Sequence, residues 1–88
     1  MKEIVKKCEY NMFEKILSGE KNFDVRLGDF QVKTGDIIIL KEVKNGSETG
    51  RELRKKVGFY LRTKELPYWT AEEKNKSGFI VMQLEELK

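Results

Sequence analysis

The spacing of apolar residues divides the N-terminal part of the chain into a strand and a helix. Residues 3–8 are typical of a short opening strand. From Asn11 onward, apolar side chains recur three and four positions apart, as they do on one face of a helix. Asn11 and Glu14 have the spacing of a capping box, and Gly19 stands where a helix C-cap is expected. We therefore predict a helix that begins near Asn11 and ends before Gly19.

The period of the pattern changes to two after residue 22. Phe23 and Val25 then point to one side of a predicted strand, and Asp24 and Arg26 point to the other. Because apolar side chains normally face a core, we expect Phe23 and Val25 to be buried.

The middle of the chain predicts a long hairpin. Residues 37–40 are a continuous apolar run, which is typical of a strand covered on both faces. The polar segment 45–50 predicts the hairpin loop, and residues 51–61 predict the returning strand. Period two places four apolar side chains on one side of that strand: Leu53, Val57, Phe59 and Leu61. The other side carries Arg54, Lys56, Tyr60 and Arg62.

The C-terminal part adds a second short helix and a last strand. Thr70 and Glu73 have capping-box spacing, and residues 79–82 form the last apolar run. About five strands with one or two short helices favour an α+β, mainly β fold, built as a small β-barrel. We predict one core made of eleven apolar side chains: Phe13, Ile16, Leu17, Phe23, Val25, Ile37, Ile39, Val57, Phe59, Ile80 and Met82.

Composition narrows the class of protein. The 88 residues correspond to a single domain, residues 1–88. No apolar run approaches the roughly 20 residues that a membrane span needs. The residues after Met1 are charged, unlike a signal peptide, so we expect a cytoplasmic protein and, by default, a monomer. The absence of histidine excludes Ser-His-Asp and Cys-His catalysis. The single Cys8 allows no internal disulfide and no Cys/His zinc site, so we expect a buried thiol, no metal and no cofactor.

The segment around residue 24 is the first candidate site. Asp24 and Arg26 lie two apart on a predicted strand, so they share a face, and Lys21 precedes them across the helix-to-strand corner. A carboxylate beside a guanidinium orients it, and the oriented fork can bind a phosphate, a carboxylate or a base edge. The alternative is an ordinary exposed ion pair, which contributes at most about 1 kcal/mol.

Two motifs begin at this segment and follow each other in order. The first is S-G-x-K-x-F-[DE]-x-R, and the second, after a short loop, is φ-x-x-G-D-x-φ-x-φ, where φ is apolar. Together they resemble the ASCH domain family, a relative of the RNA-binding PUA domain, and within it the small uncharacterised prokaryotic proteins. The matching residues are Gly19, Lys21, Phe23, Asp24, Arg26, Val32, Gly35, Asp36, Ile37 and Ile39.

The resemblance implies a PUA-like β-barrel with a cleft beside the helix–strand corner. On this basis we expect a domain that binds RNA or a nucleoside-like small molecule through Lys21, Asp24 and Arg26. The alternative is a small amidohydrolase that acts on a modified nucleoside of the acetylcytidine type. That branch of the family uses a lysine, a threonine and a glutamate. Lys21 matches the lysine and Asp24 occupies the position of the threonine, so these two would be the catalytic residues under the alternative.

A basic stretch in the returning strand is the second candidate site. Between residues 51 and 64 there are six cationic side chains and one anionic side chain. The predicted face formed by Arg54, Lys56, Tyr60 and Arg62 could contact phosphates and stack on bases. The alternative is a solvated strand face whose lysine and arginine side chains block pairing with other strands.

Overall fold

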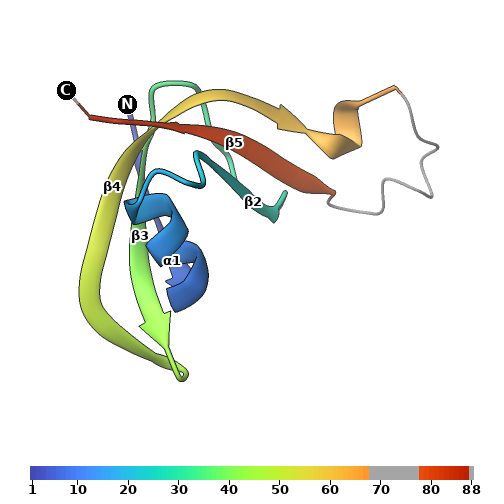
Figure 1. Cartoon of the computed structure of the whole chain (residues 1–88). Helices are drawn as coiled ribbons and strands as arrows, with labels where there is room; N and C mark the ends of the chain where they lie inside the picture. Colours follow the sequence, from blue (N-terminus) through green and yellow to red (C-terminus); the bar gives the residue numbers. More distant parts are fainter. Residues whose placement is uncertain (68–77, 88) are drawn as a thin grey trace.

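The computed structural model describes residues 1–67 and 78–87, and these residues form a curled half-barrel (Figure 1). Its elements follow the chain in this order: β1 (Glu3–Glu9), α1 (Tyr10–Leu17), β2 (Phe23–Leu27), β3 (Ile37–Lys44), β4 (Ser47–Arg62), the 3-10 turn η1 (Thr63–Glu65) and β5 (Phe79–Glu85). The prediction of a mainly β fold with about five strands is therefore confirmed. The second predicted helix, from Thr70, lies outside the described residues.

A single sheet connects all five strands in the order β1-β3-β4-β5-β2. β1 pairs with β3 in parallel, and the other neighbours are antiparallel. The two strands at the edges, β1 and β2, are joined by α1 along the chain. Figure 1 shows the long β3–β4 hairpin bending around α1, so the helix fills the hollow of the curled sheet.

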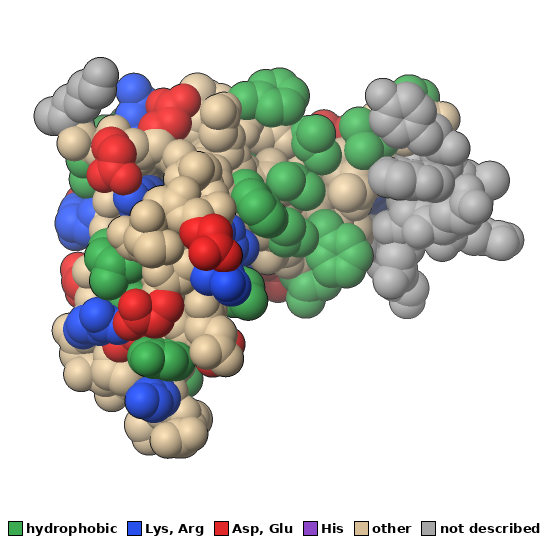
Figure 2. Space-filling view, viewed as in Figure 1, with side chains coloured by type: hydrophobic (Ala, Val, Ile, Leu, Met, Phe, Trp, Pro, Cys, Tyr) green, Lys and Arg blue, Asp and Glu red, His purple; other side chains and the backbone are tan. Residues whose placement is uncertain are grey.

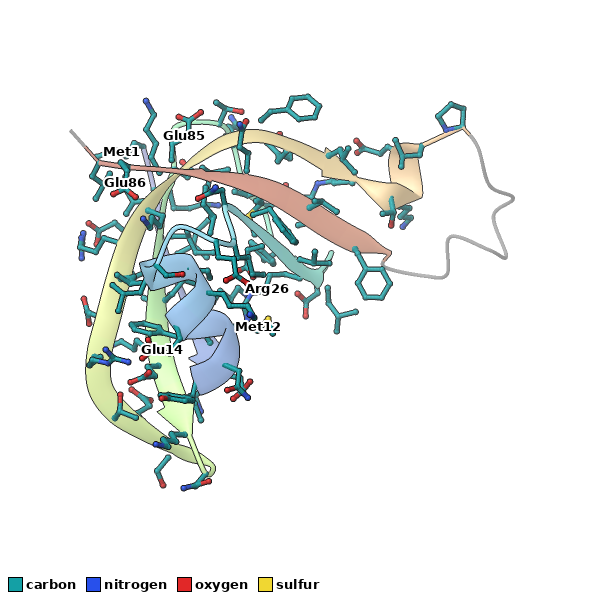
Figure 3. All side chains as sticks on the ribbon, in the orientation of Figure 1. Met1, Met12, Glu14, Arg26, Glu85 and Glu86 are labelled. Carbon is teal, nitrogen blue, oxygen red and sulfur yellow. The ribbon has the colours of Figure 1, made fainter. Side chains whose placement is uncertain are left out.

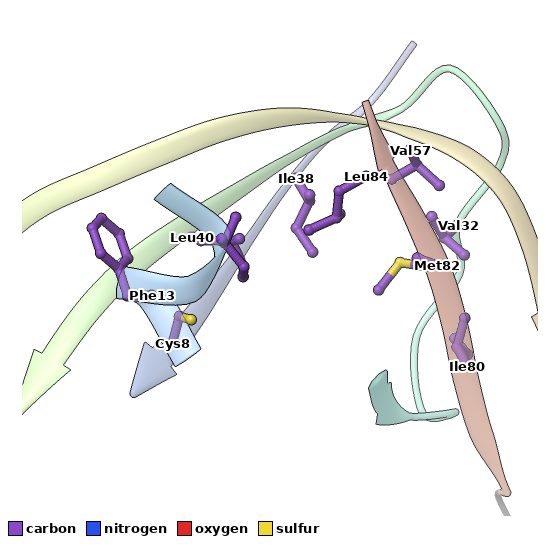
Figure 4. Packing of buried hydrophobic residues seen from close by; sticks show 10 residues of the cluster. Cys8, Phe13, Val32, Ile38, Leu40, Val57, Ile80, Met82 and Leu84 are labelled. Carbon is purple, nitrogen blue, oxygen red and sulfur yellow. The ribbon is translucent and has the colours of Figure 1, made fainter. Parts of the chain in front are cut away.

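The core lies on the concave face of the sheet, covered by α1 at one end and by the segment that carries Val32 at the other (Figure 4). Its buried side chains are Cys8, Phe13, Ile16, Val32, Ile38, Leu40, Val57, Ile80, Met82 and Leu84. The burial of Cys8 is as predicted. All four residues of the apolar run 37–40 are buried, which confirms a strand covered on both faces. Ile38 and Leu40 face the helix, whereas Ile37 and Ile39 are buried on the opposite side of β3.

Helix α1 begins one residue earlier than predicted. The N-cap is Glu9, whose carboxylate accepts a hydrogen bond from the backbone N–H of Asn11. The predicted capping box at Asn11 is therefore wrong. Because a helix of eight residues buries only a narrow stripe, Phe13 and Ile16 are buried while Leu17, its last residue, is about half-exposed.

Strand β2 faces the opposite way from the prediction. Asp24 points into the half-barrel and is buried, whereas Phe23 and Val25 are about half-exposed on the outside. The reason is that β2 is an edge strand whose inner face meets the end of β1, where the carbonyl of Lys7 accepts a hydrogen bond from Arg26. Alternation alone predicts apolar packing against the inner face of β2. The partner there is instead a polar group, the backbone carbonyl of Lys7.

The hairpin turn is shorter than the predicted loop 45–50. Asn45 and Gly46 both have positive φ angles, 53° and 80°, which is the geometry of a two-residue type I′ turn. β4 already begins at Ser47, so most of the predicted loop belongs to the strand.

A bulge in β4 reverses which side chains face the core. The register with β5 shifts between Val57 and Tyr60. At Gly58 an added Cβ atom would lie 2.5 Å from a carboxylate oxygen of Glu85, so a side chain at this position would have to displace Glu85. Beyond the bulge Phe59 is 68% exposed, and Tyr60 packs against the core instead. The prediction that Phe59 is a core residue is therefore wrong.

The Gly-Asp pair of the second motif serves the fold. The carboxylate of Asp36 accepts hydrogen bonds from the backbone N–H groups of Lys2 and Lys33, at 3.0 and 2.9 Å. Gly35 has a φ of +98°, which favours glycine. These contacts fasten the start of the chain to the turn before β3.

Away from the corner, the buried carboxylate of Glu42 on β3 is the centre of a network that includes β4 and α1. It accepts hydrogen bonds from Arg51 and Thr49 of β4, and Arg51 also pairs with Glu14 of α1. The hydrogen bonds from Arg51 and then from Thr49 lower the pKa of Glu42 from 4.5 to about 2. This network connects the helix to the turn end of the hairpin.

We expect Glu42→Gln to reduce the pH dependence of stability in acid. A pKa that is lower in the folded state contributes stability that is complete above about 4.5 and is lost as pH falls toward 2. Thermal unfolding between pH 7 and 2 should therefore show a shallower decline for Glu42→Gln than for the unmodified chain. Glu52→Gln is the matched control, because Glu52 forms only an exposed pair with Lys41. An unchanged slope for Glu42→Gln would contradict the assignment.

Candidate functional site

The corner between α1 and β2 positions the first candidate site. The helix ends at Ser18, and Gly19 follows with a φ of +85°. The backbone N–H of Lys21 then donates to the carbonyl of Lys15 at 2.9 Å, which turns the chain back along the helix. β2 begins two residues later, so Lys21 lies directly beside Asp24 on the new strand.

Asp24 is the centre of this site, and its side chain holds both cations. Its exposure is 5%. One carboxylate oxygen, Oδ2, accepts from Nε of Arg26 at 2.8 Å, and the other, Oδ1, lies 3.5 Å from Nζ of Lys21. Lys21 Nζ also donates to the carbonyl of Phe23 at 2.8 Å and lies 5.0 Å from the centre of the Phe23 ring. The structure thus brings together the three residues predicted from the sequence; we call Lys21, Asp24 and Arg26 the corner triad.

Arg26 bridges the opening of the half-barrel. In addition to its bond to Asp24, it donates from Nη1 to the carbonyl of Lys7 at 2.7 Å. This bond connects β2 to the end of β1, the opposite edge of the sheet. The Asp24–Arg26 pair is therefore not the exposed surface pair of the alternative prediction, because one partner is buried and the other is held at both ends.

Cys8 lies close enough to the corner triad to respond to its charges. Burial raises the pKa of the Cys8 thiol, and the carboxylate of Asp24 raises it further, while Arg26 and Lys21 act in the opposite direction. The sequence predicts a buried Cys8 but gives no connection between Cys8 and the corner. Its position directly after Lys7 on β1 becomes informative only once β1 and β2 are known to meet.

The net charge of the corner triad is +1, because two cations share one carboxylate. Such a site is suited to an anionic or electron-rich ligand, since the carboxylate fixes the guanidinium and the remaining donors keep their positive charge.

Within residues 1–67 and 78–87 there is no cluster of three metal-ligating acidic, cysteine or histidine side chains.

The second candidate site does not form one face. Arg54 and Lys56 are exposed on the outer side of β4, where Arg54 pairs with Glu3. Tyr60 packs against the core, and Arg62 donates to the carbonyl of Phe30 at 2.8 Å. The prediction that all four side chains share a face is wrong, because the bulge after Val57 shifts the alternation by one residue.

A hollow of about 760 Å³ lies where the two ends of the chain meet, away from the corner triad (Figure 3). It is lined by Met1, Gly35, Ile37, Lys56, Glu85, Glu86 and Leu87. None of the three corner residues contributes to it. Its charged rim is mixed in sign, so it offers less electrostatic selectivity than the corner triad does.

No helix in the described part of the chain is long and apolar enough to cross a membrane.

Comparison with known proteins gives a family and a fold. Residues 5–84 match the family described as "Domain of unknown function (DUF3850)". The crystal structure of hypothetical protein PH0355 is similar, with a TM-score of 0.66 and 24% sequence identity, over 99% of this chain and 100% of that one. At this identity the likeness concerns the fold alone. No curated protein matches the sequence.

Proposed function

This chain belongs to the DUF3850 family, and we propose that it is an ASCH- or PUA-like domain that binds RNA or a nucleotide at the corner triad. The observation that carries the proposal is the convergence of Lys21 and Arg26 on the buried carboxylate of Asp24. The DUF3850 match does not name a ligand, so the proposal depends on the chemistry of the corner.

The arrangement favours a binding site because its donors are oriented before any ligand arrives. Arg26 is held through Nε and Nη1, and its side chain keeps 22% of its surface exposed. A guanidinium held in this way loses little conformational freedom when it binds a phosphate or a base edge. Lys21 adds a second positive charge within 3.5 Å of the same carboxylate.

A polymeric ligand would gain further contacts outside the corner. Lys56 is an exposed cation on β4, and Arg54 is also exposed although it pairs with Glu3; both can neutralise phosphates whatever the base sequence. Tyr60 and Arg62 are engaged in the fold and do not enter this part of the proposal.

The alternative function, an amidohydrolase acting on an acetylated nucleoside, receives less support. Its catalytic lysine would be Lys21, which donates to the carbonyl of Phe23 and faces Asp24. A lysine acting as a base must accept a proton, whereas both of these partners favour a donor. The alternative also needs a glutamate in segment 65–73, most of which lies outside the described residues.

Arg26→Lys should weaken the binding of cytidine monophosphate, and of a short single-stranded RNA, about tenfold. Lysine keeps the charge but cannot hold Asp24 and the ligand with one planar fork, and a hydrogen bond to a charged group contributes about 1.5–3 kcal/mol. Isothermal titration calorimetry of both proteins measures the effect. Arg51→Lys is the matched control, since Arg51 is likewise held by a carboxylate but belongs to the Glu42 network.

The outcome of this titration separates the two functions. Equal affinities for Arg26→Lys and Arg51→Lys would remove the corner triad from ligand binding. Deacetylation of acetylcytidine by the unmodified chain, abolished in Lys21→Ala, would establish the amidohydrolase instead.

A further inference from the structure

The outer face of β2 and β5 is an apolar surface that the proposed function does not use. Paired residues of an antiparallel sheet point to the same side. The register places Val25 opposite Val81 and Leu27 opposite Phe79, and Phe23 follows on the same side of β2. Leu61 of β4 is paired with Val81, which widens the surface to three strands. We call these six residues the outer apolar face.

About half of the surface of four of these side chains is exposed. The exposed fractions lie between 47% and 57% for these four large apolar side chains, which are Phe23, Val25, Leu27 and Phe79. Figure 2 shows a continuous group of hydrophobic side chains beside the residues drawn in grey, and smaller separate groups over the other half of the molecule. The paired positions of this face between Phe79 and Gln83 of β5 carry no charged side chain, and the charged pair Lys56–Glu85 lies at its far end.

The size of the face can be compared with what a stable dimer requires. A phenylalanine side chain presents roughly 200 Å², so two half-exposed rings supply roughly 200 Å². The four aliphatic side chains bring the total into the range of roughly 300–600 Å² found for the largest apolar patch of a typical monomer. A standard interface buries about 800 Å² on each partner, of which a little over half is non-polar, or roughly 450 Å². The outer apolar face therefore matches the apolar part of such an interface.

The chemistry of the face favours a second copy of this chain over a nucleic acid. A polyanion gains most of its affinity from cations that contact phosphates, and among the paired positions of this side of the described strands the one cation, Lys56, stands opposite the carboxylate residue Glu85. An uncharged apolar surface can pack against its own copy without bringing like charges together, as a twofold interface requires. The face lies on the side of β2 opposite to Asp24 and Arg26 and meets the corner triad at Phe23, whose ring lies 5.0 Å from Nζ of Lys21, so its occupation leaves Arg26 accessible.

From these observations we propose that two copies of the chain associate through the outer apolar face, sheet against sheet, to form a twofold dimer. Val25 lies in the middle row of the face, between Phe23 and Leu27, and would be close to the centre of the contact. This proposal of a dimer of two half-barrels departs from the default expectation of a monomer.

Sedimentation velocity over a concentration series tests the proposal with the full chain. The unmodified protein should sediment with twice the mass of a 10.4 kDa monomer. Val25→Arg should return the mass to that of the monomer, because it places two guanidinium groups in an apolar contact. Val5→Arg is the matched control: Val5 is an equally exposed valine on β1, the other edge strand, and this variant should remain dimeric. Leu27→Ser provides a milder second change on the face should Val25→Arg fail to fold, and it should also weaken the dimer.

Three results would overturn the proposal. The first is a monomer at all concentrations. The second is a dimer that Val5→Arg disrupts and that Val25→Arg and Leu27→Ser leave intact, because the interface would then lie elsewhere. The third is a loss of RNA affinity in the folded face variants without any change of mass, which would assign the face to nucleic acid. Because the corner triad lies on the inner side of β2, a monomeric protein with tight nucleotide binding would refute the dimer and leave the proposed function intact.

Discussion

Replacing Leu40 by alanine should lower the free energy of unfolding by about 2–5 kcal/mol. Leu40 has no exposed surface, and it lies on the concave side of β3 where α1 packs (Figure 4). The deletion leaves a cavity that the parallel and antiparallel neighbours of β3 keep open, since that strand is paired on both sides. Small domains have roughly 5–15 kcal/mol of total stability, so the variant should be close to its folding threshold.

Urea denaturation followed by circular dichroism measures this loss. Val5→Ala is the control on the neighbouring strand, because Val5 is about half-exposed and its truncation creates no cavity. Ile39→Ala tests the other side of β3, where the side chain is also buried, and should likewise destabilise the protein. If Leu40→Ala and Val5→Ala lose equal stability, the core does not lie between α1 and the concave face.

Asp24→Ala should cost about 3 kcal/mol of stability, the lower end of the range for breaking a buried ion pair. The lower end applies because Lys21 and Arg26 retain some contact with solvent. Without the carboxylate, Nε of Arg26 loses its acceptor and two positive charges face each other at the corner. The change should also loosen the connection between β2 and the carbonyl of Lys7.

The control for Asp24 is an exposed ion pair next to the same corner. Lys15 and Glu20 pair at 2.8 Å with both side chains largely in solvent, so Glu20→Ala should cost much less stability than Asp24→Ala. A gain in stability for Asp24→Ala would contradict the prediction. It would also indicate that the buried carboxylate is retained for binding at the expense of stability.

Much of the fold follows from local patterns that the sequence displays. The apolar run 37–40 predicts a strand covered on both faces, and all four side chains are buried. The turn residues around Asn45 predict a hairpin, and the positive φ angles of Asn45 and Gly46 account for its tight turn. Such features depend on neighbours in the chain, and for that reason a single sequence is sufficient to predict them.

The errors occur where distant segments meet. Phe59 follows the alternation of β4 only if that strand is regular, and the bulge before it depends on pairing with β5. An isolated glycine in a strand, here Gly58, is the one local indication of a bulge. The apolar character of Phe23 and Val25 predicts that they are buried. Alternation by itself shows only that they lie on the side of β2 opposite to Asp24 and Arg26.

The two candidate sites show the same difference between predictions over short and over long stretches of the chain. Lys21, Asp24 and Arg26 were predicted to lie together, because they are separated by few residues along a corner and a strand, and the structure confirms their proximity. Arg54, Lys56, Tyr60 and Arg62 were predicted to share a face over nine residues, a distance over which one bulge was enough to separate them.

The sequence by itself thus determined the order of the elements, the tight turns, and the proximity of residues a few positions apart, since these depend on backbone preferences and local spacing. Only the tertiary structure decided which side of β2 is buried, because that depends on β1 meeting β2 and on the carbonyl of Lys7 receiving Arg26. The same contact buries Asp24 and leaves Phe23, Val25 and Leu27 outside. The corner triad and the outer apolar face are therefore two sides of one strand, oriented by a hydrogen bond between residues nineteen positions apart.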